Sequence, residues 1–253
     1  LQSRDPITIN VNPYMGFPND PRPEYNDQLI RASNVLISSL RFLRSLRSNL
    51  LEPEVYHLNP AKSDNETFRR IVSIVPNRFA WYAAFLFKAF PLDVSQYQSL
   101  FNGTRIPKHG QDELFNDPTA KHMLVIRNGH FYIFDVLDSN GHIKDPAYIH
   151  GCLHHILTDR REKVENPLAA LTSLDRDSWA TLRQHLVSIG NADALRFIDS
   201  AVFAMVLLDE VMNEDPIKMS HVMLHGDGTN YWFDKCMELI IAKDRVGMNF
   251  EHS

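Results

Sequence analysis

The sequence is poor in cysteine, lacks a long apolar run and carries no excess of positive charge. Its 253 residues include 2 cysteines, Cys152 and Cys236, which argues against a disulfide scaffold and fits a reducing or matrix-like compartment. No uninterrupted apolar run reaches the roughly 18 residues that a membrane-spanning helix needs. The formal net charge of -5 provides no basic field that would attract nucleic acid, so no nucleic-acid partner is predicted.

Several signatures of catalysis are also missing. There is no Gly-x-Ser-x-Gly elbow, so a serine hydrolase is not supported. The loop His225–Asn230 matches neither the dinucleotide fingerprint nor the phosphate-loop pattern. Two histidine pairs, His150 with His154 and His221 with His225, have the spacing of zinc ligands on a helix. A zinc site needs further ligands, and no glutamate occupies the catalytic position between them. We therefore favour incidental histidines and predict no bound metal or cofactor.

The residues that are present predict a layered α/β protein. The hydrophobic share of 44% and charged share of 23% are those of an ordinary globular chain. Alternation over residues 7–11 predicts a strand, and the Pro- and Asn-rich stretch 13–23 predicts a loop. Asp27 is placed to cap a helix that extends to about Leu50.

Strands and helices then alternate from residue 122 onwards. Asn128-Gly129 between two apolar runs predicts a hairpin of strands 122–127 and 131–136. This alternation is typical of a sheet layered against helices. Further predicted elements are helices from Asp145 to about Leu157, from Asp175 or Asp177 to Gly190 and from Pro216 to His225, and strands Ser200–Leu208, Cys236–Ala242 and Met248–His252.

The segment Phe79–Phe90 is apolar or aromatic at every position except Lys88. A buried core helix has this composition, and so does a segment at a membrane interface, where aromatic rings sit at the level of the headgroups. Four flanking cations could meet anionic lipid: Arg69, Arg70, Arg78 and Lys88. The pattern alone leaves both interpretations open. The six aromatic residues are Phe79, Trp81, Tyr82, Phe85, Phe87 and Phe90.

The last residues contain the strongest functional signal. Trp232-Phe233-Asp234-Lys235 precedes a predicted strand, and Glu251-His252-Ser253 follows the next one. This arrangement resembles the active-site segment of the carnitine/choline acyltransferases, and the resemblance extends over nearly the whole chain. Other similar stretches are Glu24–Leu29, Leu50–Val55, Leu58–Asp64, Pro91–Asp93, Ser95–Tyr97, Asp112–Phe115, Phe131–Asp138 and Met223–Asn230.

The resemblance implies both a fold and a reaction. The fold would be that of the CoA-dependent acyltransferases, a mixed β-sheet flanked by helices, with residues 1–253 as the N-terminal, histidine-bearing part of a two-domain enzyme. His252 would be the general base that deprotonates the carnitine hydroxyl, a role that suits histidine because its pKa lies near working pH. CoA and carnitine would be substrates, contacted mostly by a C-terminal domain outside this chain. The chain alone is therefore expected to be inactive.

The most similar branch of the family is the mitochondrial one that transfers long acyl chains such as palmitoyl in fatty acid oxidation. That similarity implies long-chain acyl-CoA or acylcarnitine as partners. It also implies that residues 68–97 form an insert that binds the inner mitochondrial membrane peripherally on its matrix side. We therefore expect the six aromatic residues of Phe79–Phe90 to contact lipid.

Three positions depart from the family pattern. Tyr231 replaces an arginine that usually precedes Trp-Phe-Asp-Lys, Arg245 replaces a small residue, and the loop Asp244–Glu251 is one residue short. Arginine would bring a bidentate cationic fork that tyrosine cannot supply. Tyr231 and Arg245 motivate one alternative, a membrane-docking or regulatory module that has lost turnover. The other alternative is a shorter-chain carnitine or choline acyltransferase, which would not need Phe79–Phe90 exposed.

Overall fold

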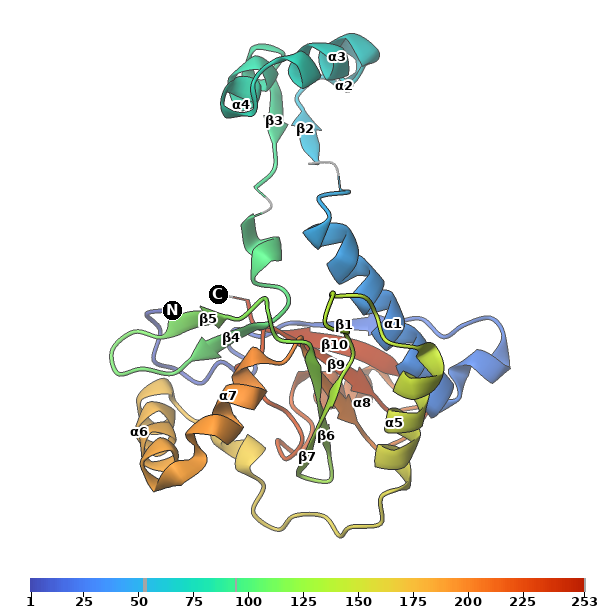
Figure 1. Ribbon diagram of the computed structural model, residues 1–253, viewed down its shortest axis with the longest axis vertical. Coiled ribbons are helices and arrows are strands. Elements are labelled where there is room, and N and C mark those ends of the chain that lie inside the picture. Colours follow the sequence, from blue (N-terminus) through green and yellow to red (C-terminus); the bar gives the residue numbers. More distant parts are fainter. Residues whose placement is uncertain (52–53, 94, 253) are drawn as a thin grey trace. The chain divides into compact units, whose positions relative to one another are not determined.

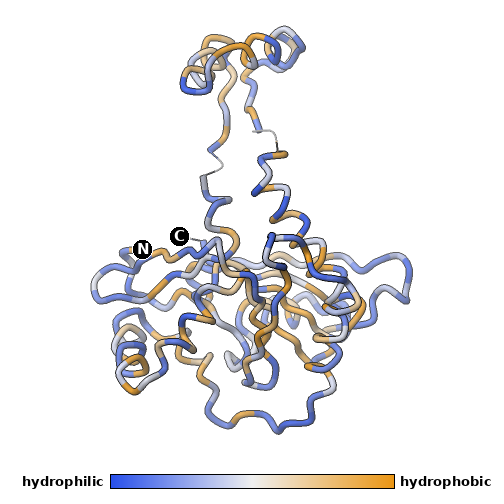
Figure 2. Tube along the Cα trace, viewed as in Figure 1, coloured by the Kyte–Doolittle hydropathy of each residue, from blue (hydrophilic) through white to orange (hydrophobic). Residues whose placement is uncertain are grey.

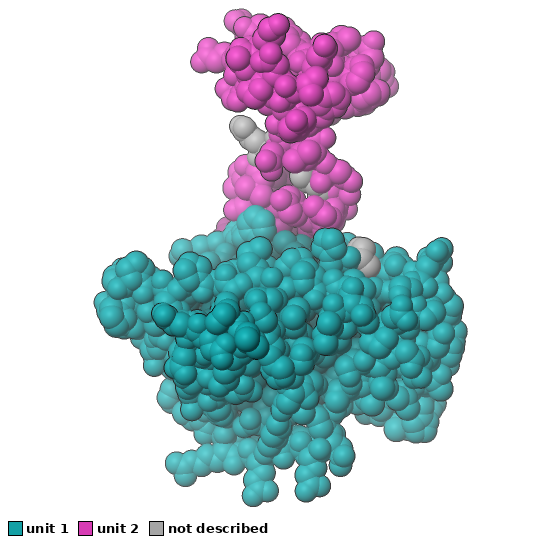
Figure 3. Space-filling view, turned by 180° about the vertical axis from the view of Figure 1, so that it is seen from behind, with its two compact units in different colours: residues 1–43, 99–253 teal, residues 44–98 magenta. Residues whose placement is uncertain are grey.

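A computed structural model describes residues 1–51, 54–93 and 95–252. It divides into two compact units (Figure 3). The main unit comprises residues 1–43 and 99–253, and the small unit comprises residues 44–98. Val94, within the predicted insert 68–97, and Ser253 lie outside the described residues.

The main unit is built on a six-stranded mixed sheet with the order β1-β10-β9-β8-β6-β7 (Figure 1). The central strands β6, β8 and β9 are parallel to one another, and the outer pairings are antiparallel. The sheet confirms the predicted fold class. The strands are β1 (Tyr14–Phe17), β6 (His122–Arg127), β7 (His130–Asp135), β8 (Ala204–Leu207), β9 (Met237–Ile241) and β10 (Val246–Phe250).

Both faces of this sheet carry helices. On one face Val222 and Met223 of one helix pack with Val206 and Ile240 of the strands. Residue alternation puts Met205 on the opposite face, the face bordered by the first helix. The helices are α1 (Gln28–Arg47), α5 (Pro146–Thr158), α6 (Arg176–Leu186), α7 (Ala192–Ser200) and α8 (Pro216–Leu224), with 3-10 turns at Pro23–Asn26 and Leu168–Ser173.

Local sequence signals account for several element ends. Asp27 caps α1 by accepting from the N–H groups of Leu29 and Ile30 at 3.0 and 3.1 Å, as predicted. Asn128 and Gly129 have φ of 53° and 77°, the left-handed values that a tight hairpin turn between β6 and β7 requires. Asp145 and Asp175 cap α5 and α6 because a carboxylate satisfies N–H groups that a helix start leaves unpaired.

The small unit has its own short sheet and apolar cluster. Strand β2 (Val55–His57) pairs antiparallel with β3 (Ala89–Pro91). Buried Phe68, Ala84 and Ala89 form the cluster, with Phe87 packed against it. Figure 2 shows hydrophobic residues on its helices. These are α2 (Pro60–Ser63), α3 (Glu66–Ile74) and α4 (Asn77–Leu86), and a 3-10 turn spans Ser95–Gln98.

Near the N-terminus the predicted strand over residues 7–11 is wrong. The N–H of Val11 donates to the Ile7 carbonyl at 2.9 Å, and Ile9 has φ of 68°, so this stretch is a turn with Ile7 buried. The strand is β1, inside the predicted loop 13–23, because it pairs with β10 at the other end of the chain.

Only the first part of the segment Phe79–Phe90 is helical. Helix α4 ends at Leu86, Lys88 adopts φ of 54°, and Ala89 begins β3. No helix among the described residues is long and apolar enough to cross a membrane.

The remaining differences are shifted boundaries and missed elements, among them the β4 (Gly103–Ile106) and β5 (Glu113–Asn116) hairpin. The final strand is Val246–Phe250 instead of 248–252, and Gly190 marks a bend before a further helix, α7, that the sequence did not predict.

Candidate active site

His252 lies two residues beyond the end of β10, which pairs along its length with β9. Its imidazole is exposed, with its ring centre 6.2 Å from that of Phe250. Phe250 lies opposite Met237, and Met248 lies opposite Leu239. These four side chains share one face of the sheet. The predicted base therefore follows a largely apolar strip.

Glu251, the residue before His252, is fixed by a buried ion pair. Its carboxylate accepts from Nη1 of Arg105 at 2.9 Å, and the two side chains are 3% and 1% exposed. Its backbone N–H donates to the Cys236 carbonyl at 3.3 Å. The main chain next to the candidate base is thus held through both its backbone and a side chain.

Arg105 is the first member of a buried ionic network. It lies in β4 (Gly103–Ile106), which pairs with β5 (Glu113–Asn116). Its Nε donates to Asp112 at 2.7 Å, and the same Asp112 oxygen accepts from Nε of Arg176 at 2.7 Å. Nη1 of Arg176 then donates to Asp234 at 2.6 Å, and Trp179 Nε1 donates to the other Asp234 oxygen at 2.6 Å. We call Glu251, Arg105, Asp112, Arg176, Asp234 and Trp179 the buried network.

The pKa values of Asp112 and Arg176 shift in the directions expected of ion pairs, whereas burial raises the pKa of Asp234 despite its contact with Arg176. Burial alone would raise the pKa of Asp112, but Arg176, Arg4 and Arg105 together lower it below its ordinary value. Burial alone would lower the pKa of Arg176, but Asp234 and Asp112 together raise it above its ordinary value. Both groups therefore stay ionised at neutral pH.

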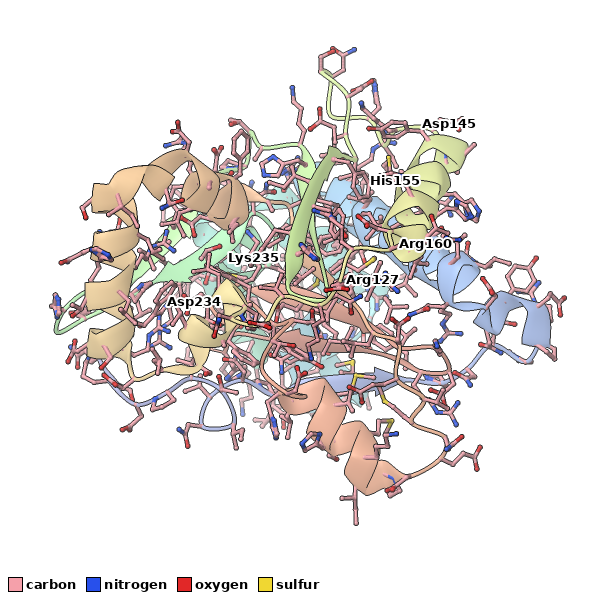
Figure 4. The ribbon with its side chains drawn as sticks, turned by 90° about the horizontal axis from the view of Figure 1, so that it is seen from below. Arg127, Asp145, His155, Arg160, Asp234 and Lys235 are labelled. Atoms are coloured by element: carbon pink, nitrogen blue, oxygen red, sulfur yellow. The ribbon has the colours of Figure 1, made fainter. Side chains whose placement is uncertain are left out.

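A second buried pair has its own hydrogen bonds, although burial raises the pKa of Asp234 and the charge of Arg183 helps to counteract that rise. Arg183 of α6 donates to the carboxylate of Asp199 in α7. Lys235 donates to the Asp199 backbone carbonyl at 2.6 Å and to Thr104 Oγ1 at 3.2 Å. Burial lowers the Lys235 pKa to about 8. Figure 4 labels Lys235 and Asp234, which precede β9.

Tyr231 is a core residue. Its hydroxyl donates to the Val222 carbonyl at 2.6 Å, and its ring stacks on Phe233 with centroids 5.5 Å apart. Nearby Glu238 accepts from the Trp232 N–H at 2.6 Å, and burial raises its pKa to about 8. Arg245 lies in the turn between β9 and β10, 3.6 Å from Glu214.

An apolar groove of about 610 Å³ opens beside α1. Its floor includes Met237, Leu239 and Met248, and Phe42 and Phe101 form part of its wall. Since Phe250 shares the face of Met248, this strip of the sheet continues toward His252.

The histidine pairs do not form a metal centre. No group of three or more His, Cys, Asp or Glu side chains in the described residues is arranged to hold an ion. His150 Nδ1 lies 3.3 Å from Ser33 Oγ, linking α5 to α1, and the rings of His221 and His225 pack edge to face.

The six aromatic residues of the small unit differ in exposure. Five are exposed at the surface, led by Trp81 at 61% and Phe85 at 54%. Phe87 instead packs against Phe68, with ring centres 5.6 Å apart, so it belongs to the small unit's own core.

The sequence predicted His252 but not the buried network that holds the residue before it. Arg105 and Asp112 stand 7 residues apart in the β4–β5 hairpin, but Arg176 comes from a distant segment, and no sequence pattern connects the three. No local signal could have found them, because Asp112 is flanked by Gln111 and Glu113, and Arg176 by Asp175 and Asp177, so both look like ordinary surface charges.

Comparison with known proteins gives concordant matches. The model of the choline/carnitine O-acyltransferase family matches residues 1–253. The mitochondrial carnitine O-palmitoyltransferase 2 proteins of Macaca fascicularis and Homo sapiens are each 56% identical over 254 residues, covering 100% of this chain and 38% of theirs. Carnitine O-acetyltransferase of Rattus norvegicus is 28% identical over 268 residues with the same coverage. The chain thus spans 38% of the length of these relatives.

Proposed function

Because this chain belongs to the choline/carnitine O-acyltransferase family, we propose that it carries the catalytic histidine of a long-chain carnitine acyltransferase. The reaction is the reversible transfer of palmitoyl between CoA and L-carnitine in mitochondrial fatty acid oxidation. The observation that carries the proposal is the placement of His252, exposed at the end of β10 beside a residue locked into the buried network.

In this reaction His252 removes the proton from the carnitine hydroxyl, and the oxygen attacks the thioester carbonyl of palmitoyl-CoA. The tetrahedral intermediate collapses by breaking the carbon–sulfur bond. The CoA sulfur then takes the proton from His252, so the base is regenerated. A histidine can do this in both directions because its ordinary pKa lies near neutral pH.

The apolar groove supports a long acyl chain as the transferred group. Its floor of Met237, Leu239 and Met248 offers flexible apolar side chains on the strands that lead to His252. Burying methylenes is favourable by about 0.8 kcal/mol each, so a groove of this kind favours palmitoyl over acetyl.

We place the remaining machinery in the part of the protein that the relatives' greater length implies. Donors for the oxyanion and most contacts to CoA and carnitine belong there, as does the second domain of the active-site tunnel. On this proposal the 253-residue chain alone does not turn over.

Residues 68–97 are the proposed membrane-associating insert, and the location is the matrix side of the inner mitochondrial membrane. Five exposed aromatics of Phe79–Phe90 support it. Between residues 55 and 92 the chain has five Lys or Arg against two Asp or Glu, although the whole chain is acidic. A basic surface with exposed aromatic rings suits an anionic bilayer.

Carnitine-dependent release of free CoA thiol tests the function. The full-length protein containing this chain should release thiol faster from palmitoyl-CoA than from acetyl-CoA, and only when carnitine is present. Release without carnitine would indicate a thioesterase, and preference for acetyl-CoA would favour the shorter-chain alternative. Absence of release from the folded protein would favour the membrane-docking alternative.

A further inference from the structure

We propose that Arg105 and Glu251 are positioning residues for His252, acting together as a clamp that fixes the main chain next to the base. The inference rests on the proposed function of His252 and concerns residues that would touch neither CoA nor carnitine. Its basis is a continuous set of buried contacts.

The clamp acts where regular structure stops. Regular pairing between β10 and β9 ends at the Phe250–Met237 register, and beyond it one backbone hydrogen bond, from the Glu251 N–H to the Cys236 carbonyl at 3.3 Å, still holds residue 251. At this point Glu251 turns its carboxylate into the protein, to Nη1 of Arg105 at 2.9 Å. A side-chain contact thus adds to the last backbone hydrogen bond between the two strands.

Charge makes this contact specific. Glu251 is 3% exposed at its side chain, and a carboxylate this deeply buried is stable only beside a compensating cation. The residue preceding the base must therefore follow the guanidinium of Arg105. Any other path would take the buried Glu251 carboxylate away from this cation, while Arg105 would stay paired with Asp112.

Arg105 is itself held rigidly, so the clamp has a fixed anchor. Its N–H donates to the Asp234 carbonyl at 2.8 Å, and its Nε donates to Asp112 at 2.7 Å. Arg176 completes the brace by contacting both Asp112 and Asp234. Through these contacts, strand β4, helix α6 and the segment before β9 together fix the position of Glu251.

This rigidity matters because proton transfer is sensitive to placement. Displacement of a reacting group by about 1 Å can cost on the order of 10²-fold in rate. Loosening the clamp should therefore lower kcat more than it changes the Michaelis constants, since the substrates bind to other residues.

The test compares three variants of the full-length protein with the parent in palmitoyl transfer to carnitine. Glu251→Gln keeps shape but removes the charge. Arg105→Lys keeps the charge but loses the planar fork that engages two carboxylates. Arg183→Lys is the matched control, because it weakens a different buried arginine–aspartate pair.

We expect kcat to fall roughly 10- to 100-fold in Glu251→Gln and Arg105→Lys, with both Michaelis constants within about threefold. The double variant should lose no more than the worse single variant, since each breaks the same contact. Arg183→Lys should lower the thermal midpoint comparably and leave kcat within about twofold.

Unchanged kcat in the two clamp variants would overturn the proposal. So would a kcat that tracks the thermal midpoint equally in all three variants, because that pattern describes a structural role alone. Failure of the proposed function would look different. In that case the parent itself would show no transfer, or His252→Ala would transfer palmitoyl as fast as the parent.

Discussion

At the scale of single residues, the network that holds the residue before His252 consists of charges that are buried in pairs. Arg105, Asp112, Arg176 and Asp234 are each at most 3% exposed. Taking such groups out of water is costly unless each one finds its partner. The network therefore adds specificity of placement more than net stability.

Asp112 is the residue on which this network depends most, because it accepts from both Arg105 and Arg176. Asp112→Asn should lower the free energy of unfolding by about 3–5 kcal/mol, the usual cost of breaking a buried pair. Urea unfolding at pH 7 measures it. A loss as small as that of a surface substitution would contradict this account.

The pH dependence of this effect has a defined sign. The pKa of Asp112 is below its ordinary value of 3.8 in the folded protein, so its contribution is complete above that value. It is lost as pH falls through the lower, folded pKa. The difference between parent and Asp112→Asn should accordingly shrink below about pH 4.

Glu238 should behave in the opposite way. Burial raises its pKa from 4.5 to about 8, so the folded protein keeps a proton that the unfolded chain releases. Stability is therefore lost as pH rises from 4.5 toward 8. Glu238→Gln, which retains an acceptor for the Trp232 N–H, should be more stable than the parent at pH 8.

Melting temperatures of the parent and Glu238→Gln across this range provide the check. The advantage of the variant should grow with pH and vanish near pH 4.5. An advantage that does not change with pH would mean that Glu238 is ionised in the folded protein.

The candidate site was only partly predictable at this scale. His252 could be predicted because it stands in a short motif whose residues are adjacent in the sequence. Arg105 and Arg176 are 71 residues apart, and their meeting depends on the β4–β5 hairpin docking against α6. No periodicity in the sequence encodes such a contact. Tyr231 likewise looked like a lost cation, whereas it fills the core.

At the scale of elements, predictions succeeded where the cause was local. The Asn128-Gly129 hairpin and the Asp27 cap follow from the conformations that these residues favour or the N–H groups that they satisfy. Strand β1 was missed because its pairing with β10 joins positions more than 200 residues apart. Residues 7–11 alternate like a strand, but no neighbouring strand accepts them.

The joint between α6 and α7 gives an element-scale prediction. Gly190 has φ of 96°, and a Cβ there would meet nothing within 4 Å. Gly190→Ala should therefore cost only the backbone strain, about 1–2 kcal/mol of unfolding free energy. Urea unfolding measures the cost, and an unchanged or increased stability would show that the bend is not populated.

Helix α4 gives a second prediction at the scale of elements. Trp81→Ser with Phe85→Ser removes two exposed aromatics that the proposed insert would bury in lipid. Each ring is worth about 1.5–3 kcal/mol when buried, so vesicle binding should weaken at least about tenfold. Co-sedimentation with phosphatidylcholine vesicles containing phosphatidylserine is the measurement.

The control is Ile217→Ser, which removes an exposed apolar residue from α8 in the main unit. It should leave vesicle binding unchanged. Equal binding by the parent and the double α4 variant would remove these aromatics from the membrane contact.

At the scale of the whole molecule, the two units divide the chemistry. The main unit holds His252, the buried network and the apolar groove. The small unit holds the exposed aromatics and a basic stretch within an acidic chain. On the proposed function, this division would separate acyl transfer from lipid contact.

The most direct test of this account is palmitoylcarnitine formed from palmitoyl-CoA and carnitine, quantified by mass spectrometry. The full-length protein and its His252→Ala variant would be compared under identical conditions. We predict product from the parent and a rate at least about 10²-fold lower in the variant, the usual contribution of a general base. Equal rates in the two proteins would contradict the assignment of His252 as the base.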